Sequence, residues 1–250
     1  MKPRRIGLLA AAVAALLALM PVTAFGAGGR LRDTALGDSI AAGYGATNRY
    51  GYVNYFRDFL LTLAPRVDLS NDAVPGLNSS GLLFELRYSS TVRDDIRRAD
   101  VLTVSIGGNN LLPCASNNYS TLNTLCAYAG VAAFRYDWPR MLSTIRADIG
   151  ARASLLVLTL YNPYRGDEAN YATADTYIEQ INAGIQNASY RSTYNYKVAD
   201  AHTDFQGKFA DGSWKVCTWT HFCEANRDPH PTDSGHRELA VDRLHQAIYR

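Results

Sequence analysis

A serine and a histidine far apart in the sequence have the side chains that a nucleophilic active site requires. Ser39 lies in the sequence Gly37-Asp38-Ser39, which directly follows the first predicted strand, and His230 lies near the C-terminus in the sequence DPHP. A serine hydroxyl is a weak nucleophile until a neighbouring base accepts its proton, and histidine suits that exchange near neutral pH. The pair predicts acyl transfer from an ester, with Ser39 as the nucleophile and His230 as the general base and then the general acid.

Attack on an ester carbonyl creates an oxyanion, which needs hydrogen-bond donors already in place. The candidates are the backbone N–H groups of Ser39 and Gly76 and the side-chain amide of Asn109. Removing one such donor costs about 3 kcal/mol in the activation barrier. Glycine at position 76 lets the backbone approach a substrate, because no Cβ intervenes. These three residues are the predicted oxyanion hole.

The elements that must position these residues follow an alternating pattern. Short apolar runs alternate with segments of helical periodicity, which is typical of a parallel α/β sheet. The predicted strands are 33–36, 67–71, 101–106, 154–160 and 197–201, and the predicted helices are 52–63, 91–98, 131–149, 172–188 and 234–249. Inside the third helix, Pro139 indicates a kink or a late start. Loops at the carboxyl ends of parallel strands meet at one edge of the sheet, so Ser39, Gly76 and Asn109 are expected in one pocket.

Four sequence blocks also carry a family resemblance. The blocks GDSIAAGYG, AVPGLNSSG, IGGNN and DPHP resemble those of the SGNH/GDSL serine hydrolase family in order and approximate spacing. The resemblance covers essentially the whole chain after position 33 and places Ser39 on the nucleophile, Gly76 and Asn109 on the oxyanion donors and His230 on the base. It implies a three-layer α/β/α sandwich with a flavodoxin-like, doubly wound parallel sheet of about five strands. It also implies esterase, lipase or related acyl-hydrolase activity without a metal or an organic cofactor.

Two positions depart from the family pattern. Asn110 occupies the usual aspartate position of the third block, and modest consequences are expected. In the last block Asp228 lies two residues before His230 instead of three. Either Asp228 or a backbone carbonyl near Arg227 could accept the ring N–H and hold the required tautomer, and Asp228 is the preferred candidate.

The N-terminus has the pattern of a secretory signal peptide. Basic residues at 1–5 precede an apolar run at 6–20 and small residues that allow cleavage after Ala24 or Gly26. The alternative is an uncleaved membrane anchor, although the run is short for a spanning helix. We therefore expect a signal peptide at 1–26, a hydrolase domain at 27–250, and a secreted protein without stable membrane insertion.

Export changes the interpretation of the four cysteines, because disulfides persist outside the cell. Four cysteines allow three pairings. The local pairs Cys114 with Cys126 and Cys217 with Cys223 are preferred, because each would enclose one loop-like segment. The alternative is a zinc site at Cys217, His221 and Cys223, which would supply three ligands without the paired spacing of a structural site. The other histidines, His202, His236 and His245, are expected in surface loops or on helix surfaces.

The charge balance argues against nucleic acids and anionic membranes as partners. Without Lys2, Arg4 and Arg5, 22 basic residues face 23 acidic ones, and no basic run remains for nucleic acid or anionic membranes. The sequence also lacks a phosphate-binding loop, an HExxH zinc motif and a GxSxG nucleophile elbow. A small-molecule or lipid ester is the expected partner. Two alternatives remain: a carbohydrate O-acetylesterase, and a non-catalytic protein that binds an acyl group or a sugar on the same fold.

Overall fold

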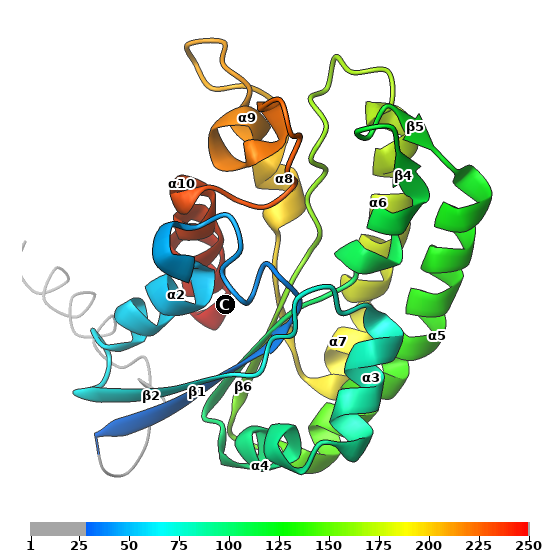
Figure 1. Ribbon diagram of the computed structural model, residues 1–250. Coiled ribbons are helices and arrows are strands. Elements are labelled where there is room, and N and C mark those ends of the chain that lie inside the picture. The colour runs from blue at the N-terminus through cyan, green and yellow to red at the C-terminus, as the bar shows by residue number, and fades with distance from the viewer. Residues whose placement is uncertain (1–28, 250) are drawn as a thin grey trace, which may run out of the picture.

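Five parallel strands form the centre of the molecule (Figure 1). The computed structural model describes residues 29–249, and the predicted signal peptide at 1–26 lies outside them. The strands are β1 (Arg30–Gly37), β2 (Arg66–Asn71), β3 (Val101–Ser105), β6 (Ser154–Leu158) and β7 (Lys197–Ala199). They lie in the order β2-β1-β3-β6-β7, and every pair is parallel. This is the flavodoxin-like order, which confirms the predicted sheet.

Helices cover both faces of this sheet, as Figure 1 shows. On one face, α2 (Tyr52–Leu60), α8 (Ala201–Phe205), α10 (Asp233–Arg237), a π-helical segment (Glu238–Leu244) and α11 (His245–Tyr249) surround Leu31, Ala35, Val101, Leu156 and Leu158. On the other face, α3 (Ser79–Tyr88), α4 (Ser90–Arg98), α5 (Thr124–Asp148) and α6 (Tyr171–Ile185) surround Leu36, Leu102, Val104, Leu155 and Val157. All five residues of β3 are buried, as expected for a parallel strand between two helical layers.

Several elements were not predicted from the sequence. They are α3, α7 (Ala188–Tyr194), α8, α9 (Lys215–Trp219) and a hairpin of β4 (Ala115–Ser116) and β5 (Thr121–Leu122). The helix α5 begins at Thr124 and runs through Pro139, so the predicted late start is wrong. The side chain of Asn123 accepts a hydrogen bond from the Cys126 N–H and caps this earlier start. The predicted helix at 234–249 is divided into α10, the π-helical segment and α11.

Two disulfides close loops beside the sheet. The structure pairs Cys114 with Cys126 and Cys217 with Cys223, which is the local pairing preferred from the sequence. Because both sulfurs of the second pair are bonded to each other, the alternative zinc site at Cys217, His221 and Cys223 is wrong. Within residues 29–249, no helix is long and apolar enough to cross a membrane.

A carboxyl group is buried in the central strand β1. Asp33 is 1% exposed, and neither of its carboxylate oxygens has a hydrogen-bond partner among the described residues. Burial raises its pKa to about 8, and the charge of Arg57 opposes that rise only in part. The folded protein therefore favours the neutral acid, whereas the unfolded chain ionises near pH 4.

This difference predicts a pH-dependent stability. The folded-state pKa is raised, so the free energy of unfolding should fall as the pH rises from about 4 to about 8. Asp33→Asn should remove up to about 1.4 kcal/mol per pH unit of this slope. Urea titrations across that range measure it, with Asp94→Asn on the exposed surface of α4 as the control. Equal slopes in the wild type and Asp33→Asn would contradict the buried neutral acid.

Candidate active site

The structure brings the predicted serine, histidine and aspartate into one hydrogen-bonded chain. The Nε2 atom of His230 lies 2.8 Å from the Oγ atom of Ser39. The Nδ1 atom of the same ring lies 2.5 Å from the Oδ1 atom of Asp228. An imidazole held this way can accept the serine proton on Nε2 while its Nδ1–H remains bonded to the carboxylate.

A local turn explains how Asp228 reaches the ring from two residues away. The Oδ1 atom of Asp228 also accepts a hydrogen bond of 3.0 Å from the backbone N–H of His230. This is an Asx-turn, which folds the carboxylate back over the following residues. Arg227 precedes it with a φ of 47° and forms an ion pair with Glu168. Of the two predicted alternatives, the Asp228 carboxylate is the group that contacts the ring.

Ser39 lies in the turn that follows β1, where the ends of β1 and β3 lie side by side. The backbone N–H of Asp38 donates to the carbonyl oxygen of Ser105 at 3.3 Å. Gly37 has a φ of 154°, and a Cβ on it would lie 2.3 Å from the same oxygen. Only glycine lets the two strand ends approach this closely. Since β2 and β3 flank β1 on opposite sides, this edge is the switch point at which such sheets bind ligands.

The predicted oxyanion donors line the same opening as Ser39. An open cavity of about 610 Å³ is lined by residues that include Ser39, Gly76, Asn109 and His230. The Nδ2 atom of Asn109 donates to the carbonyl oxygen of Leu77 at 3.0 Å and faces a carboxylate oxygen of Asp38 at 3.4 Å. The shorter bond holds the amide at the rim of the opening.

The hydrogen bonds of Asn110 explain why an amide can stand where the family pattern has an aspartate. Its Oδ1 atom accepts a hydrogen bond from the Ser79 N–H, and its Nδ2 atom donates to the Ser79 hydroxyl and to the Gly130 carbonyl oxygen. A carboxylate could accept the first of these bonds but could not donate the others. The amide thus ties the loop after β3 to α3 and α5.

Two residues at the site were missed in the sequence. Asp38 is buried beside Ser39 and accepts the Ile40 N–H, and burial raises its pKa to about 7. The hydroxyl of Tyr161 donates to the carbonyl oxygen of Pro229 at 2.5 Å and supports the segment that carries His230. The position of Asp38 beside Ser39 is a usable signal, whereas the contact of Tyr161 depends on tertiary structure.

The segment around His230 is held by groups from other parts of the chain. The backbone N–H of His221 donates to the carbonyl oxygen of His230 at 3.1 Å, and the His221 ring binds the carbonyl oxygen of Gly45 at 3.0 Å. Gly45 in turn packs against this segment, because a Cβ on it would lie 2.2 Å from the carbonyl oxygen of Pro231. These contacts set the distance between His230 and Ser39.

The surface placement of two other histidines is wrong. His236 is fully buried, where its Nδ1 accepts the Tyr52 N–H and its Nε2–H donates to the Tyr44 carbonyl oxygen. Burial lowers its pKa to about 4, so the ring is neutral. His202 is mostly covered and binds Asp175. The sequence analysis placed both histidines on the surface because the sequence does not show that a histidine has a buried hydrogen-bond partner in another element.

A second, narrower cavity is also lined by Ser39. It has a volume of about 80 Å³ and is lined mainly by apolar side chains, together with Ser39, Asn109 and His230. An adjoining apolar cavity of about 60 Å³ shares with it Leu111, Leu112, Pro163 and Ile178. Ser39 therefore belongs to the lining of both the narrow apolar space and the wide opening.

Comparisons with known proteins agree with this fold. The family model described as the GDSL-like Lipase/Acylhydrolase family matches residues 35–238. The chain is 29% identical over 183 residues to the spore germination lipase LipC of Bacillus licheniformis, covering 71% of this chain and 83% of LipC. It is 30% identical over 132 residues to the uncharacterized protein YpmR of Bacillus subtilis, spanning 52% of this chain and about half (51%) of YpmR. The lipase Lip_vut3 from a goat rumen metagenome has a TM-score of 0.71 and 25% identity, covering 88% of this chain and 98% of its own.

The chain belongs to the GDSL-like lipase/acylhydrolase family. That family places it among the carboxylic ester hydrolases. An acetylxylan esterase of Geobacillus stearothermophilus, with a TM-score of 0.60 and 15% identity over 87% of this chain and 93% of its own, shares the fold.

The packing of Gly45 against the His230 segment predicts an effect on catalysis. Gly45→Ala should push Pro231 and His230 away from Ser39, and a displacement of about 1 Å lowers kcat/KM by about 100-fold. Ester hydrolysis by the purified variant measures this loss. Gly212→Ala is the matched control, because Gly212 has a similar φ of 87° but nothing within 4 Å of an added Cβ. Equal activities of the two variants would contradict the role of Gly45.

Proposed function

We propose that this protein is a secreted serine esterase that hydrolyses acyl esters through a covalent acyl-enzyme on Ser39. The observation that carries the proposal is the continuous chain of hydrogen bonds from Ser39 through His230 to Asp228. The two disulfides and the signal-peptide pattern at 1–26 support secretion.

The geometry supports a two-step reaction. In the first step, the Ser39 oxygen forms a bond to the ester carbonyl carbon while His230 accepts the serine proton. His230 then gives that proton to the departing alcohol, and the acyl group remains on Ser39. In the second step, water attacks the acyl-enzyme, His230 accepts a water proton, and the acid leaves as the proton returns to Ser39.

The other site residues have supporting roles in this reaction. Asp228 holds the tautomer of His230 that leaves Nε2 free and stabilises the imidazolium that forms during each step. The N–H groups of Ser39 and Gly76 and the amide of Asn109 face the developing oxyanion. Asn109 releases its long contact with Asp38 when its amide turns to the substrate oxygen.

Substitution of the triad tests the mechanism directly. Ser39→Ala should lower kcat by about 10⁶-fold and Asp228→Asn by about 10⁴-fold, because the first removes the nucleophile and the second the correct tautomer. Hydrolysis of p-nitrophenyl butyrate measures both, with Asp94→Asn as the control. An organophosphonate should label Ser39 in the wild type only. Absence of labelling and of turnover in the wild type would reject the esterase and support the non-catalytic binding protein.

The two cavities support an assignment of the substrate. The narrow apolar cavity beside Ser39 accepts the acyl chain, and the wide opening accepts the alcohol part. Together with its neighbour, the narrow cavity approaches the volume of about 150 Å³ that holds one benzene molecule. The fit favours acyl chains of about four to eight carbons over acetyl and palmitoyl groups.

A chain-length series tests this assignment. The wild type should show its highest kcat/KM on p-nitrophenyl esters of about four to eight carbons, because each buried methylene contributes about 0.8 kcal/mol. Leu111→Trp should shift the preference toward acetate by filling the junction of the two cavities. The exposed Leu125→Trp is the control. Activity confined to acetyl esters would instead support a carbohydrate O-acetylesterase.

A further inference from the structure

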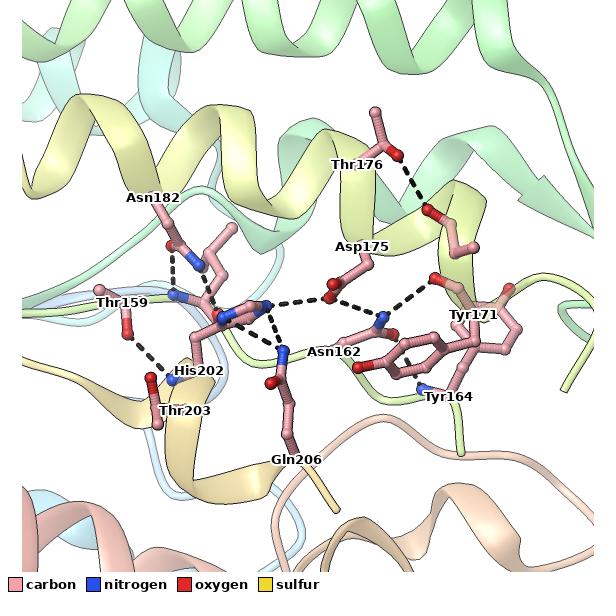
Figure 2. Close-up of polar contacts among 12 residues, drawn as sticks. Thr159, Asn162, Tyr164, Tyr171, Asp175, Thr176, Asn182, His202, Thr203 and Gln206 are labelled. Carbon is pink, nitrogen blue, oxygen red and sulfur yellow. Dashed lines mark hydrogen bonds and ion pairs between the residues drawn. The ribbon is translucent and has the colours of Figure 1, made fainter. Parts of the chain in front are cut away.

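A cluster of three ligand-type side chains lies outside the residues that line the Ser39 cavities. Asp175 and Glu179 are one turn apart on α6, and His202 lies at the start of α8. One ligand atom from each of the three lies within 4.8 Å of the others. Figure 2 shows the His202 ring pointing at Asp175, and the Nε2 to Oδ1 distance is 2.9 Å. The spacing of four residues places both carboxylates on the same face of α6.

The His202 ring has side-chain partners at both of its nitrogens. Its Nε2 atom lies 2.9 Å from a carboxylate oxygen of Asp175. The side-chain amide nitrogen of Gln206 lies 3.1 Å from Nε2 and 3.4 Å from Nδ1. In the neutral ring, Nε2–H can donate to the carboxylate while Nδ1 accepts from the amide. A cation at this point would take the place of the Nε2 proton, because it binds the ring lone pair and the carboxylate together. A half-turn of the Gln206 amide would then add its oxygen as a further ligand.

Neighbouring residues hold the two covered ligands in place. The Nδ2 atom of Asn162 donates to Oδ1 of Asp175 at 3.0 Å and to the carbonyl oxygen of Tyr171 at 3.2 Å. The backbone N–H of His202 donates to the hydroxyl of Thr159 at 3.0 Å. Such outer contacts orient metal ligands and contribute to affinity. The side chains of His202 and Asp175 are only 12% and 17% exposed, so the cluster is partly shielded from water.

The third ligand lies where a cation would enter. Glu179 is exposed and lines an open cavity of about 640 Å³ together with His202, Asp200 and Arg135. Asp200 and Glu179 attract a cation, and Arg135 is the opposing positive charge. Ligands around a tetrahedral ion lie about 3.4 Å apart, so these three groups, all within 4.8 Å of one another, need only a small rearrangement to surround an ion.

We propose that Asp175, Glu179 and His202 bind a divalent transition metal, with Zn²⁺ as the best fit. One imidazole and two carboxylates form a mixed nitrogen and oxygen set, which suits Zn²⁺ better than the all-oxygen preference of Ca²⁺ and Mg²⁺. The ion would clamp α6 to α8, and Asn162 in the loop after β6 is linked to the site by its hydrogen bond to Asp175. Since Leu160 and Tyr161 in that loop line the narrow cavity, the site stabilises one of its walls. This inference does not depend on the proposed ester hydrolysis.

The test uses the untagged mature protein after removal of metal with a chelator. Titration with ZnCl₂ should show one equivalent bound, and Zn²⁺ at about 100 times its Kd should raise Tm by about 5 °C. Glu179→Gln should weaken binding at least about tenfold without changing the Tm of the metal-free protein, because Glu179 is exposed. Glu85→Gln on α3 is the matched control and should bind as the wild type does.

A second variant distinguishes zinc binding at this site from zinc binding at other histidines. His202→Gln should abolish the Zn²⁺-dependent rise in Tm, and circular dichroism of the metal-free variant verifies its fold. Binding that is absent in the wild type, or unchanged in both Glu179→Gln and His202→Gln, overturns the proposal. A rise in Tm with Ca²⁺ or Mg²⁺ but not with Zn²⁺ overturns the choice of metal. Metal-free Glu179→Gln should hydrolyse esters as fast as the wild type does. Failure of the zinc-site proposal can therefore be distinguished from failure of the proposed esterase function.

Discussion

The parallel sheet in which β2 and β3 lie on opposite sides of β1 is the constraint on which the remaining structure depends. The chain leaves β1 for one side, returns through β2, and crosses to β3 on the other side. The loops after β1 and β3 therefore begin side by side and diverge, which opens a crevice at their carboxyl ends. Ser39 and Asn109 occupy these two loops. Burial of both sheet faces under helices keeps the crevice at the edge, where backbone groups are free to meet a ligand.

The third component of the crevice comes from a segment that belongs to no strand. The residues before α10 hold His230 through the Asx-turn of Asp228, the contacts of His221 and the hydroxyl of Tyr161. The disulfide between Cys217 and Cys223 closes the loop just before this segment. Irregular backbone needs such partners, because it lacks the hydrogen-bond ladder of a sheet. These hydrogen bonds thus hold His230 in position, as the sheet holds the turn that carries Ser39.

Differences in burial give three carboxyl groups of this fold different environments, and burial raises the pKa of two of them. Asp33 and Asp38 are both buried, and the loss of hydration raises the pKa values to about 8 and about 7. The smaller rise at Asp38 accompanies a hydrogen bond from the Ile40 N–H, which stabilises its charged form. Asp228 retains a side-chain exposure of 34% and contacts a ring nitrogen instead. The carboxylate at the triad therefore keeps access to water that the two in and beside β1 have lost.

The sequence by itself predicted the parallel sheet and the residues that the structure brings together at the candidate site. The central strands β3 and β6 are short apolar runs whose burial on both faces leaves a direct signal. Ser39, Gly76 and Asn109 lie in recognisable blocks that follow β1, β2 and β3, and His230 lies in the block before α10. Tertiary structure decided what depends on contacts between distant segments. It selected Asp228 over a backbone carbonyl, buried His236 and joined His202 to Asp175. The sequence does not show whether a polar side chain faces water or is buried in a hydrogen-bond network. Only the folded chain brings it to the partner that satisfies it when it is buried.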